Sequence, residues 1–373
     1  MKNSALRVLM ISKALVVGAY HKKLEELARL GIELHLIIPT HYGNQRPEIL
    51  HGNGYTIHVL PIIFSGKNHF HFYPHLKHYI QNIKPDILHI DEEAHSFVTY
   101  YAMRYAVQFH IPALFFNWQN IYKRYPWPFR EFEQYNFSHV AVGIAGSKEI
   151  RDVLLKKGCT KIEISIIPQF GVDTTVYCPS SQQKLRKQLF GDAEKIIGFA
   201  GRFVEEKGVL DLLEAASFLP KAMHVALIGS GPQQSAIERR IRQLKLQDRV
   251  HILGSVKSTA MPKYLNTMDC IVLPSLTHPN WKEQFGRILI EAMACEVPVI
   301  GSSSGEIPNV IGDAGYIFPE GNSMILADVI QKLFDDEEQR KKIGSAGRAR
   351  VEQCYTQKII AESTFEVYKI MGK

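Results

Sequence analysis

The segment PSLTHPNWKEQFGRILIEAMACEVPVIGSSSGEIPNVI, from Pro274 to Ile311, sets the architecture of the second half of this chain. Its pattern predicts the end of a buried strand, a polar loop, a helix, a second buried strand and a turn. The helix begins near Gly286, and the residues that follow are apolar nearly all round, so we expect it to be buried. A strand, a helix and a strand in this order indicate a parallel sheet.

Two carboxylates flank the start of this helix: Glu283 precedes it, and Glu291 lies roughly 8 Å along its axis. Gly286 lets a ligand approach free backbone N–H groups, and a helix N-terminus favours an anion. A diphosphate there would place a sugar at Glu283 and ribose hydroxyls at Glu291, which suits a nucleotide-sugar. Alternatively, Glu283 only stabilises the helix dipole and Glu291 is a solvated helix residue, but a Glu291 inside a buried helix needs a partner.

The chain of 373 residues is long enough for two domains, and 46% of its residues are hydrophobic. No apolar run reaches the length of a membrane span, and residues 5–12 are interpreted as a strand rather than a signal peptide. Five scattered cysteines form no CxxC pair. This pattern predicts a reducing compartment, the cytoplasm, and no zinc site.

Positive charge gathers in the first half of the chain. Residues 1–168 hold 19 Lys and Arg against 13 Asp and Glu. No zinc finger, helix-turn-helix or dense basic run occurs, so we expect no nucleic acid partner. An anionic acceptor or reversible contact with the inner face of an anionic membrane fits better. The segment Tyr122–Arg130 is either a loop packed on its own domain or an exposed rim for an acceptor or lipid head group.

Alternating strands and helices predict an α/β protein with two Rossmann-like domains. We expect strands at 6–11, 33–39, 55–63, 85–90, 113–117, 139–145, 162–168, 195–200, 224–228, 250–253, 270–274 and 316–319. We expect helices at 21–30, 75–83, 96–108, 182–189, 209–218, 234–244, 260–266, 339–354 and 357–371, and a further helix that begins after Ser147 as its N-cap. The predicted domains are 1–168 and 181–355, with a hinge at 169–180 and a closing helix at 356–373 that completes the first domain.

Polar side chains follow several predicted strands, where ligands bind in open parallel sheets. Asp91, Glu92 and Glu93 follow one strand, and Gln119 and Asn120 follow another. Of these acids, Asp91 and Glu93 are a candidate for a magnesium site. The triplet at 229–231 is GSG, but a glutamine stands where the dinucleotide fingerprint needs a third glycine, so it does not predict NAD binding.

Three motifs resemble a known family: EQFGRILIEAMACEVPVIGS at 283–302, GRFVEEKG at 201–208 and PQFGVD at 168–173. Together they resemble a retaining glycosyltransferase of family 4, over the second domain and the linker. The first domain resembles the family only in its order of strands and helices. The resemblance implies the GT-B fold, with two Rossmann-like domains facing each other across a donor and acceptor cleft. It implies transfer of a hexosyl unit from a nucleotide-diphosphate sugar, UDP rather than GDP, to a glycan or glycolipid in polysaccharide or cell-envelope synthesis.

The resemblance also implies roles for individual residues. Three would be catalytic: Glu283 would hold hydroxyls of the donor sugar, and Arg202 and Lys207 the diphosphate. Phe285, Gly286 and Arg287 would offer backbone amides, and Glu291 would bind ribose. Gly254, Ser255 and Val256 would lie near the nucleobase, and Gly18 partly matches the glycine-rich turn after the first strand. The histidine that many members carry is missing, so the first-domain candidates stay open: Glu92, His95, Gln119, Asn120, Lys123 and Arg124.

Arg202 and Lys207 face a diphosphate in this interpretation, so we expect no metal ion and no cofactor. The alternative is that both pair with Glu205 and Glu206 on the surface. Two other functions stay open. One is a nucleotide-sugar-binding protein without turnover, and the other is a transferase to a small soluble acceptor of the sugar-phosphate type. A second anion site in the first domain would mark the latter, and Lys123 with Arg124 would serve it or a membrane equally well.

Overall fold

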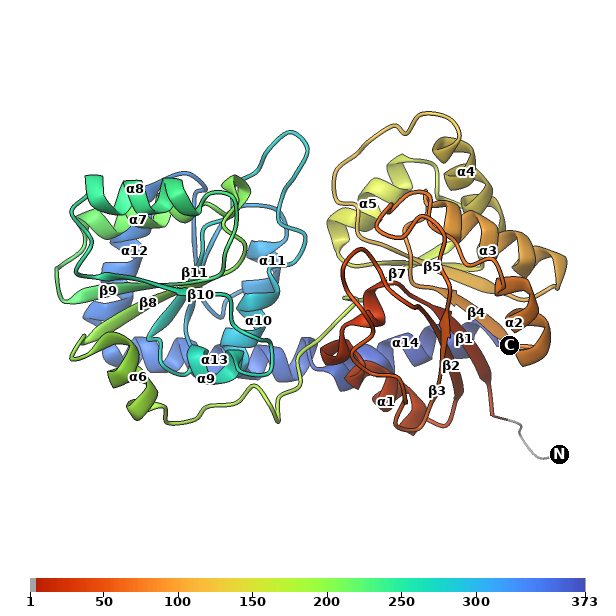
Figure 1. Cartoon of the computed structure of the whole chain (residues 1–373), viewed down its shortest axis with the longest axis horizontal. Coiled ribbons are helices and arrows are strands. Elements are labelled where there is room, and N and C mark those ends of the chain that lie inside the picture. Colours follow the sequence, from red (N-terminus) through yellow and green to blue (C-terminus); the bar gives the residue numbers. More distant parts are fainter. Residues whose placement is uncertain (1–4, 373) are drawn as a thin grey trace. The chain divides into compact units, whose positions relative to one another are not determined.

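The computed structural model describes residues 5–372. Residues 1–4, at the start of the first predicted domain, and Lys373, at the end of the predicted closing helix, lie outside the described part. The chain divides into two compact units. Unit 1 comprises the chain up to Gly171 together with the segment from Gln357 onward, and unit 2 is Val172–Thr356. Each unit is built on one parallel sheet (Figure 1).

Unit 1 has a seven-stranded sheet in the order β3-β2-β1-β4-β5-β6-β7, and all its pairings are parallel. Its strands are β1 (Arg7–Ile11), β2 (Glu33–Pro39), β3 (Thr56–Leu60), β4 (Ile87–Ile90), β5 (Ala113–Asn117), β6 (Val142–Ala145) and β7 (Glu163–Ile166). Its helices are α1 (Lys22–Arg29), α2 (Leu76–Ile83), α3 (Phe97–Gln108), α4 (Phe129–His139), α5 (Lys148–Lys156) and α14 (Gln357–Met371), with short 3-10 turns at Ala14–Val16 and Gly18–Tyr20. The strand order reverses between β1 and β4.

The central strand β1 is apolar on both faces, so it contributes to two cores. Leu9 and Ile11 pack with residues of α2, α3, α4 and α5. Val8 and Met10 pack on the opposite side with residues of α1 and α14. A strand buried on both faces is a near-continuous apolar run, and RVLMI is such a run. The closing helix α14 therefore covers part of the first sheet.

Unit 2 has a six-stranded parallel sheet in the order β10-β9-β8-β11-β12-β13. Its strands are β8 (Lys195–Ala200), β9 (Met223–Ile228), β10 (Val250–Gly254), β11 (Cys270–Leu273), β12 (Val299–Ser302) and β13 (Tyr316–Phe318). Its helices are α6 (Gln183–Phe190), α7 (Val209–Phe218), α8 (Gln234–Gln243), α9 (Met261–Leu265), α10 (Arg287–Ala294), α11 (Ile307–Ile311), α12 (Ser323–Asp335) and α13 (Glu337–Cys354), with a 3-10 turn at Glu205–Lys207. Here the order reverses between β8 and β11.

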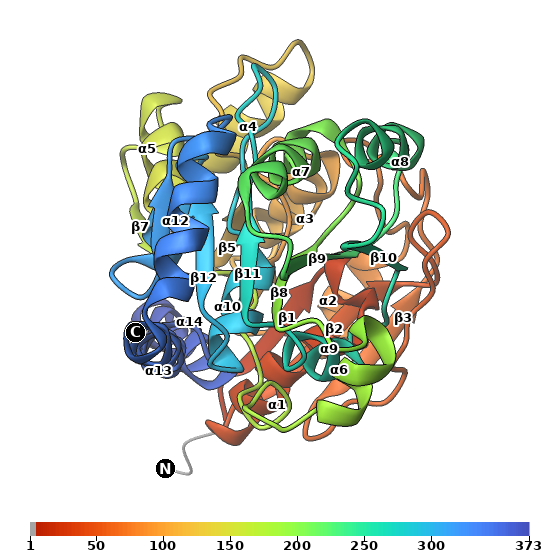
Figure 2. The ribbon, with the colours of Figure 1, turned by 90° about the vertical axis from the view of Figure 1, so that its left-hand side faces the viewer.

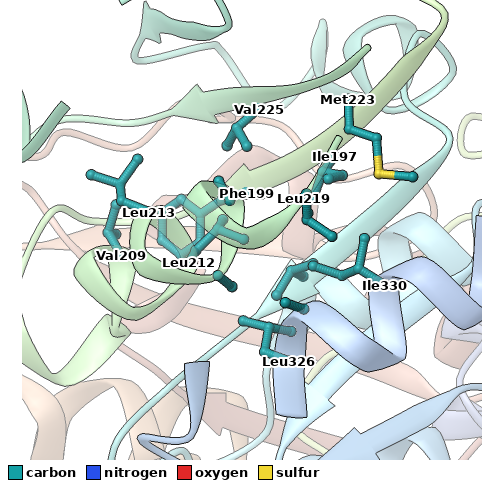
Figure 3. Close-up of a cluster of buried hydrophobic side chains, with 14 of the residues drawn as sticks. Ile197, Phe199, Val209, Leu212, Leu213, Leu219, Met223, Val225, Leu326 and Ile330 are labelled. Atoms are coloured by element: carbon teal, nitrogen blue, oxygen red, sulfur yellow. The ribbon is translucent and has the colours of Figure 1, made fainter. Parts of the chain in front are cut away.

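Helices cover both faces of the second sheet. Helices α7 and α8 lie on one face and α6 and α9 on the other in both views (Figure 2). Phe199 of β8 packs with Leu212 of α7 and Leu326 of α12 in a core of fully buried side chains (Figure 3). Burying a side chain of this size contributes about 1.5–3 kcal/mol. This core fixes the position of β8, and the loop that carries Arg202 and Lys207 begins where β8 ends.

Three helices of the structure, α4, α11 and α12, are missing from the sequence-based prediction, which placed a turn where α11 lies. Helix α4 follows a proline-rich loop, and its sequence FREFEQYNFSH has aromatic residues on several sides instead of one apolar stripe. Helix α12 begins at Asn322, whose side chain accepts a hydrogen bond from the N–H of Ile325 at 3.0 Å. An asparagine before an apolar stretch is a known start signal for a helix, and it could have been used to predict α12 from the sequence.

Candidate active site

A pocket of unit 2 lies at the carboxyl ends of its central strands, where the strand order reverses. It has a volume of about 460 Å³ and is lined by the loops after β8, β9, β10 and β11 and by the start of α10. Open parallel sheets bind ligands at this point because loops from adjacent strands run to opposite faces there. The pocket lies entirely within unit 2.

The loop from Gly201 to Gly208 brings two cations to this pocket, Arg202 and Lys207. Lys207 Nζ lies 2.5 Å from Oε2 of Glu283, and in the described part of the chain neither Glu205 nor Glu206 forms an ion pair with it. It also lies 5.0 Å from the centre of the Trp281 ring. Arg202 is exposed, and within the described chain no carboxylate lies within ion-pair distance of it. Its guanidinium can therefore turn to an anionic ligand.

Glu283 is held from three directions. The Ser275 hydroxyl donates a hydrogen bond to its Oε2 at 2.8 Å, and Lys207 pairs with the same oxygen. The backbone N–H of Glu306 donates to the carbonyl of Glu283 at 3.0 Å. The residue is 6% exposed. A carboxylate fixed in this way presents its remaining acceptor capacity in a defined direction, as recognition of sugar hydroxyls requires.

Gly286 starts helix α10 in a backbone conformation that other residues rarely adopt. Its φ is +79°, and a Cβ there would lie 2.8 Å from the Leu273 side chain. The glycine therefore lets the loop turn sharply into the helix at the pocket wall. The first turn of a helix leaves backbone N–H groups without intrahelical partners, and these face anions favourably.

Glu291 is buried on α10 and has the partner that its position demands. The Nε of Arg287, one turn earlier, lies 2.9 Å from Oε1 of Glu291. Burial raises the pKa of Glu291, and the Arg287 guanidinium opposes that rise. Both side chains line the pocket. Arg287 thus contributes its side chain here, in addition to the backbone amide that the resemblance implies.

The other predicted donor residues divide into two groups. Ser255 and Val256 line the pocket, whereas Phe285 packs on Tyr355 and Gly254 accepts a hydrogen bond from the Gly229 N–H at 2.8 Å. Gly18 belongs to unit 1 and is not part of this pocket. Its N–H donates to Glu48 Oε2 at 2.6 Å.

Gly229 and Ser230 also line the pocket and were not predicted as site residues. They belong to the GSG triplet after β9, which was excluded as a dinucleotide motif. A Cβ on Gly229 would lie 1.9 Å from the carbonyl oxygen of Gly201, so the absence of a side chain lets these two loops touch. The position of GSG at the end of a predicted strand was the feature of the sequence that could have identified Gly229 and Ser230 as pocket residues.

Unit 1 has a charged cluster at its own reversal point, between β1 and β4. Lys13, after β1, pairs with Glu92, after β4, and the Lys13 N–H donates to Oε1 of the same carboxylate at 2.9 Å. His71 lies 3.5 Å from Glu92. Burial alone would raise the pKa of Glu92, but Lys13 and His71 outweigh it and hold the pKa at about 2. Glu92 is therefore an ionised, structurally paired carboxylate.

The neighbouring acids have different environments. Asp91 accepts hydrogen bonds from the Ser12 hydroxyl at 2.7 Å and from the Gln169 amide at 2.9 Å. Burial raises the pKa of Glu93 to about 7, although its Oε1 accepts a hydrogen bond from the Trp118 N–H at 3.0 Å. Within residues 5–372, no three His, Cys, Asp or Glu side chains gather in the manner of a metal site.

The remaining first-domain candidates lie around Tyr125. The His95 ring stacks on Tyr125 with ring centres 4.0 Å apart, and burial lowers the pKa of His95 to about 2. Gln119 accepts a hydrogen bond from Lys157 at 3.1 Å. Lys123 and Arg124 line a separate pocket beside Tyr125, and Asn120 is buried. The structure thus brings His95, Gln119, Lys123 and Arg124 into one region of unit 1, while Glu92 belongs to the Lys13 cluster.

Two Rossmann-like units, each with an acid paired to a cation where its strand order reverses, are the architecture of the GT-B fold class. The family model "Glycosyltransferase Family 4" matches residues 21–176, and "Glycosyl transferases group 1" matches residues 180–350. The chain belongs to the family 4 glycosyltransferases that these two models describe.

Curated relatives match part of the chain. N-acetyl-alpha-D-glucosaminyl L-malate synthase of Bacillus anthracis is 32% identical over 54% of this chain and 52% of its own length. The capsular polysaccharide biosynthesis glycosyltransferase CapM of Staphylococcus aureus is 35% identical over 48% of this chain and 47% of its own. The chain thus spans about half the length of the curated relatives it matches.

Solved structures match the whole described architecture. HepE of Anabaena, crystallised with UDP, has a TM-score of 0.80 at 18% identity and covers 98% of this chain and 99% of its own. A complex of HepE with UDP-glucose has a TM-score of 0.76 at 19% identity, with the same coverage of both chains. At this level of identity the likeness establishes the GT-B fold. Across residues 5–372, every helix is too short or too polar to cross a bilayer.

Proposed function

We propose that this chain is a retaining glycosyltransferase that moves a hexosyl unit from a nucleotide-diphosphate sugar to a glycan or glycolipid acceptor. Unit 2 binds the donor and unit 1 the acceptor. The observation that carries the proposal is the pairing of Lys207 with Glu283 inside a pocket that also holds Arg202 and the Arg287–Glu291 pair. This set offers cations for a diphosphate and carboxylates for hydroxyl groups.

UDP is the proposed nucleotide, in preference to GDP. The fold-level neighbour HepE is bound to UDP and UDP-glucose, which supports a uridine nucleotide in an architecture of this kind. The relative CapM is named for capsular polysaccharide biosynthesis, which supports a role in making polysaccharide or cell envelope. Guanosine nucleotides remain the comparison that the test below includes.

In the proposed reaction the acceptor oxygen bonds to the anomeric carbon as the bond from that carbon to the diphosphate breaks. The acceptor proton passes to the leaving diphosphate, and attack occurs on the face that the diphosphate leaves, so configuration is retained. Arg202 and Lys207 stabilise the charge on the diphosphate, and no metal is needed. Lys207 has three N–H donors, so it can pair with Glu283 and still contact a phosphate oxygen.

Glu283 positions the sugar and is not the nucleophile. Its Oε2 is engaged by both Lys207 and Ser275, and a carboxylate neutralised by a cation attacks carbon less readily. Hydrogen bonds from sugar hydroxyls to its carboxylate oxygens would orient the anomeric carbon instead. Orientation of this kind contributes several kcal/mol to catalysis.

Two assays test this function. In a thermal-shift screen, UDP-glucose and related UDP-sugars should stabilise the protein more than GDP-mannose does, because a ligand that binds the native state raises its stability by mass action. A hydrolysis assay then distinguishes an enzyme from a binding protein, since slow release of UDP from the donor indicates turnover. Stabilisation without any UDP release, with every acceptor class tested, would leave only a nucleotide-sugar-binding protein.

We also propose that unit 1 touches anionic membranes reversibly, in the cytoplasm at the inner face. The basic balance before residue 169 and the segment Tyr122–Arg130, whose Trp127 is 81% exposed, support this contact. Such attraction is screened over about 8–10 Å at physiological salt. Co-sedimentation with anionic vesicles should therefore fall as salt rises, and a protein that ignores such vesicles at low salt has a soluble acceptor.

A further inference from the structure

A second pocket lies wholly within unit 1, apart from the charged cluster at Lys13. It has a volume of about 390 Å³, within the range of small-molecule sites. The loop after β5, the first turns of α4 and the end of α5 form it. Five cationic side chains line it: Lys123, Arg124, Arg130, Lys156 and Lys157.

The floor of this pocket is a buried ion pair. Lys157 Nζ lies 2.7 Å from Oε1 of Glu133, and the two side chains are 5% and 7% exposed. Burial raises the pKa of Glu133, and Lys157 opposes that rise. Lys157 also donates to Gln119 at 3.1 Å. Of the described residues that line the pocket, Glu133 is the single carboxylate, and Lys157 already uses it.

The Tyr122 side chain contacts two of the other cations, Arg124 and Lys156, without neutralising them. Lys156 Nζ lies 4.8 Å from the centre of the Tyr122 ring, and Arg124 Nε donates to the Tyr122 hydroxyl at 3.3 Å. In the part of the chain that the structure describes, Arg124, Arg130 and Lys156 have no carboxylate within ion-pair distance. A ring face attracts a cation but leaves its charge intact. The pocket therefore carries a positive potential that attracts anions.

A simpler explanation covers only part of this arrangement. Lys156 and Lys157 stand at the C-terminal end of α5, where cations stabilise the helix dipole. Lys123 and Arg124 belong to a loop, and Arg130 lies in the first turn of α4, where the dipole disfavours a cation. Helix stabilisation thus gives no reason for the gathering of these three around the same cavity.

The pocket also adjoins the region of the first-domain candidates. Tyr125 lines it, packs under Lys157 at 4.5 Å, and stacks on His95 with ring centres 4.0 Å apart. His95 and Gln119 follow β4 and β5, so their contacts with Tyr125 and Lys157 connect the pocket lining to the carboxyl edge of the sheet. The pocket thus adjoins the edge where unit 1 would receive an acceptor.

We propose that this pocket binds a phosphate group of the acceptor, as a phosphate ester or diphosphate. Arginine forks match phosphate oxygens in pairs, and lysines supply compact charge beside them. The role as acceptor site rests on the proposed glycosyl transfer, but binding of phosphate by the pocket does not. The phosphate comes either from a soluble sugar phosphate or from a lipid head group, and the experiment below separates these sources.

The first arm measures binding of inorganic diphosphate to the full chain by calorimetry, with UDP at saturation to occupy the pocket of unit 2. The test variant is the double substitution Arg130→Ala with Lys156→Ala. The control is Lys77→Ala with Arg104→Ala, which removes the same charge from exposed positions on α2 and α3. Charge-assisted hydrogen bonds predict at least tenfold weaker binding for the test variant and little change for the control.

The second arm repeats the comparison with phosphatidylcholine vesicles that contain phosphatidic acid. If the test variant, but not the control, loses affinity for diphosphate and still binds vesicles, the ligand is a soluble phosphate. If the test variant, but not the control, loses binding to the vesicles, the ligand is a lipid head group. Thermal unfolding of both variants checks that each is folded. The proposal is overturned if wild type binds neither probe, or if test and control variants lose binding equally. A diphosphate effect without donor turnover would overturn only the proposed glycosyl transfer.

Discussion

The ammonium group of Lys207 lies 2.5 Å from the Oε2 of Glu283, and this contact joins the loop after β8 to the loop after β11. The residues are 76 positions apart in sequence. Their strands are neighbours where the sheet order reverses, so both partners line the pocket of unit 2. Each partner keeps the other in place, and the pair connects the proposed diphosphate and sugar positions.

Removing the Glu283 carboxylate should lower turnover more than nucleotide affinity. Glu283→Gln keeps the shape of the side chain but loses the charge that Lys207 and Ser275 engage. We expect kcat to fall about 10²–10³-fold with a small change in UDP affinity, because this contact acts mainly in the transition state. Steady-state kinetics with UDP-glucose measure it, and Glu205→Gln is the control. A wild-type kcat in Glu283→Gln contradicts the assignment.

The two cations should replace a metal ion at the leaving diphosphate. Arg202→Ala and Lys207→Ala should each lower the rate about 10²–10³-fold, as the loss of a donor to a developing anion does. The wild-type enzyme should keep its activity after exhaustive EDTA treatment. Activity that disappears with EDTA and returns with magnesium would overturn the metal-free mechanism. Near-normal rates in both variants would mean that the two residues are only surface charges.

Glu291 should govern nucleotide affinity. Glu291→Ala removes a buried carboxylate that we expect to accept hydrogen bonds from ribose hydroxyls, in the ground state and transition state alike. The dissociation constant for UDP, measured by calorimetry, should rise at least tenfold, and kcat at saturating donor should change little. Glu338→Ala, on an exposed position of α13, is the control. Unchanged UDP affinity would show that Glu291 only pairs with Arg287.

Glu93 should make stability depend on pH. Burial raises its pKa to about 7 from the ordinary 4.5, so the native state holds a proton that the unfolded chain has lost between these values. The contribution of Glu93 to the free energy of unfolding is complete below pH 4.5. It is lost as the pH rises through 7, and the free energy of unfolding falls by roughly 3 kcal/mol at most. Glu93→Gln should remove this fall in the free energy of unfolding, because glutamine does not ionise.

Urea titrations at several pH values compare Glu93→Gln with wild type. The variant should match wild type near pH 4.5 and be more stable above pH 7. Glu163→Gln, at an exposed position of β7, should follow the wild-type curve. Parallel curves for wild type and Glu93→Gln would mean that Glu93 is ionised in the native state throughout this range.

Much of the donor pocket could be predicted because its residues follow strand ends in recognisable local patterns. The turn at Gly286 and the buried Glu291 are consequences of a glycine before an apolar helix. The pairing of Lys207 with Glu283 could not be predicted from spacing, since it depends on β8 and β11 becoming neighbours. The contribution of Gly229 was missed for a related reason: it acts by letting two separate loops touch.

Only part of the basic pocket beside Tyr125 in unit 1 could be predicted from the sequence. Lys123 and Arg124 stand out as a basic pair in an aromatic loop. Lys156 and Lys157 reach the same cavity from the end of α5, and α4, which supplies Arg130 and Glu133, was not predicted. Without that helix, nothing in the local pattern links residue 123 to residue 157. The alternation of strands and helices can be predicted from local sequence patterns. This pocket depends instead on how three separate segments of the chain pack together.

The closing helix α14 has a consequence for the order of synthesis. Tyr368 is fully buried, and its hydroxyl lies 2.6 Å from Nδ1 of His89. The ribosome makes all of unit 2 between the seventh strand of unit 1 and this helix. Until α14 emerges, the nascent first sheet leaves apolar surface around Val8 and Met10 partly uncovered. We expect unit 2 to fold before unit 1 is complete. A chain released before Gln357 would expose this apolar surface in the cell and would be prone to aggregate.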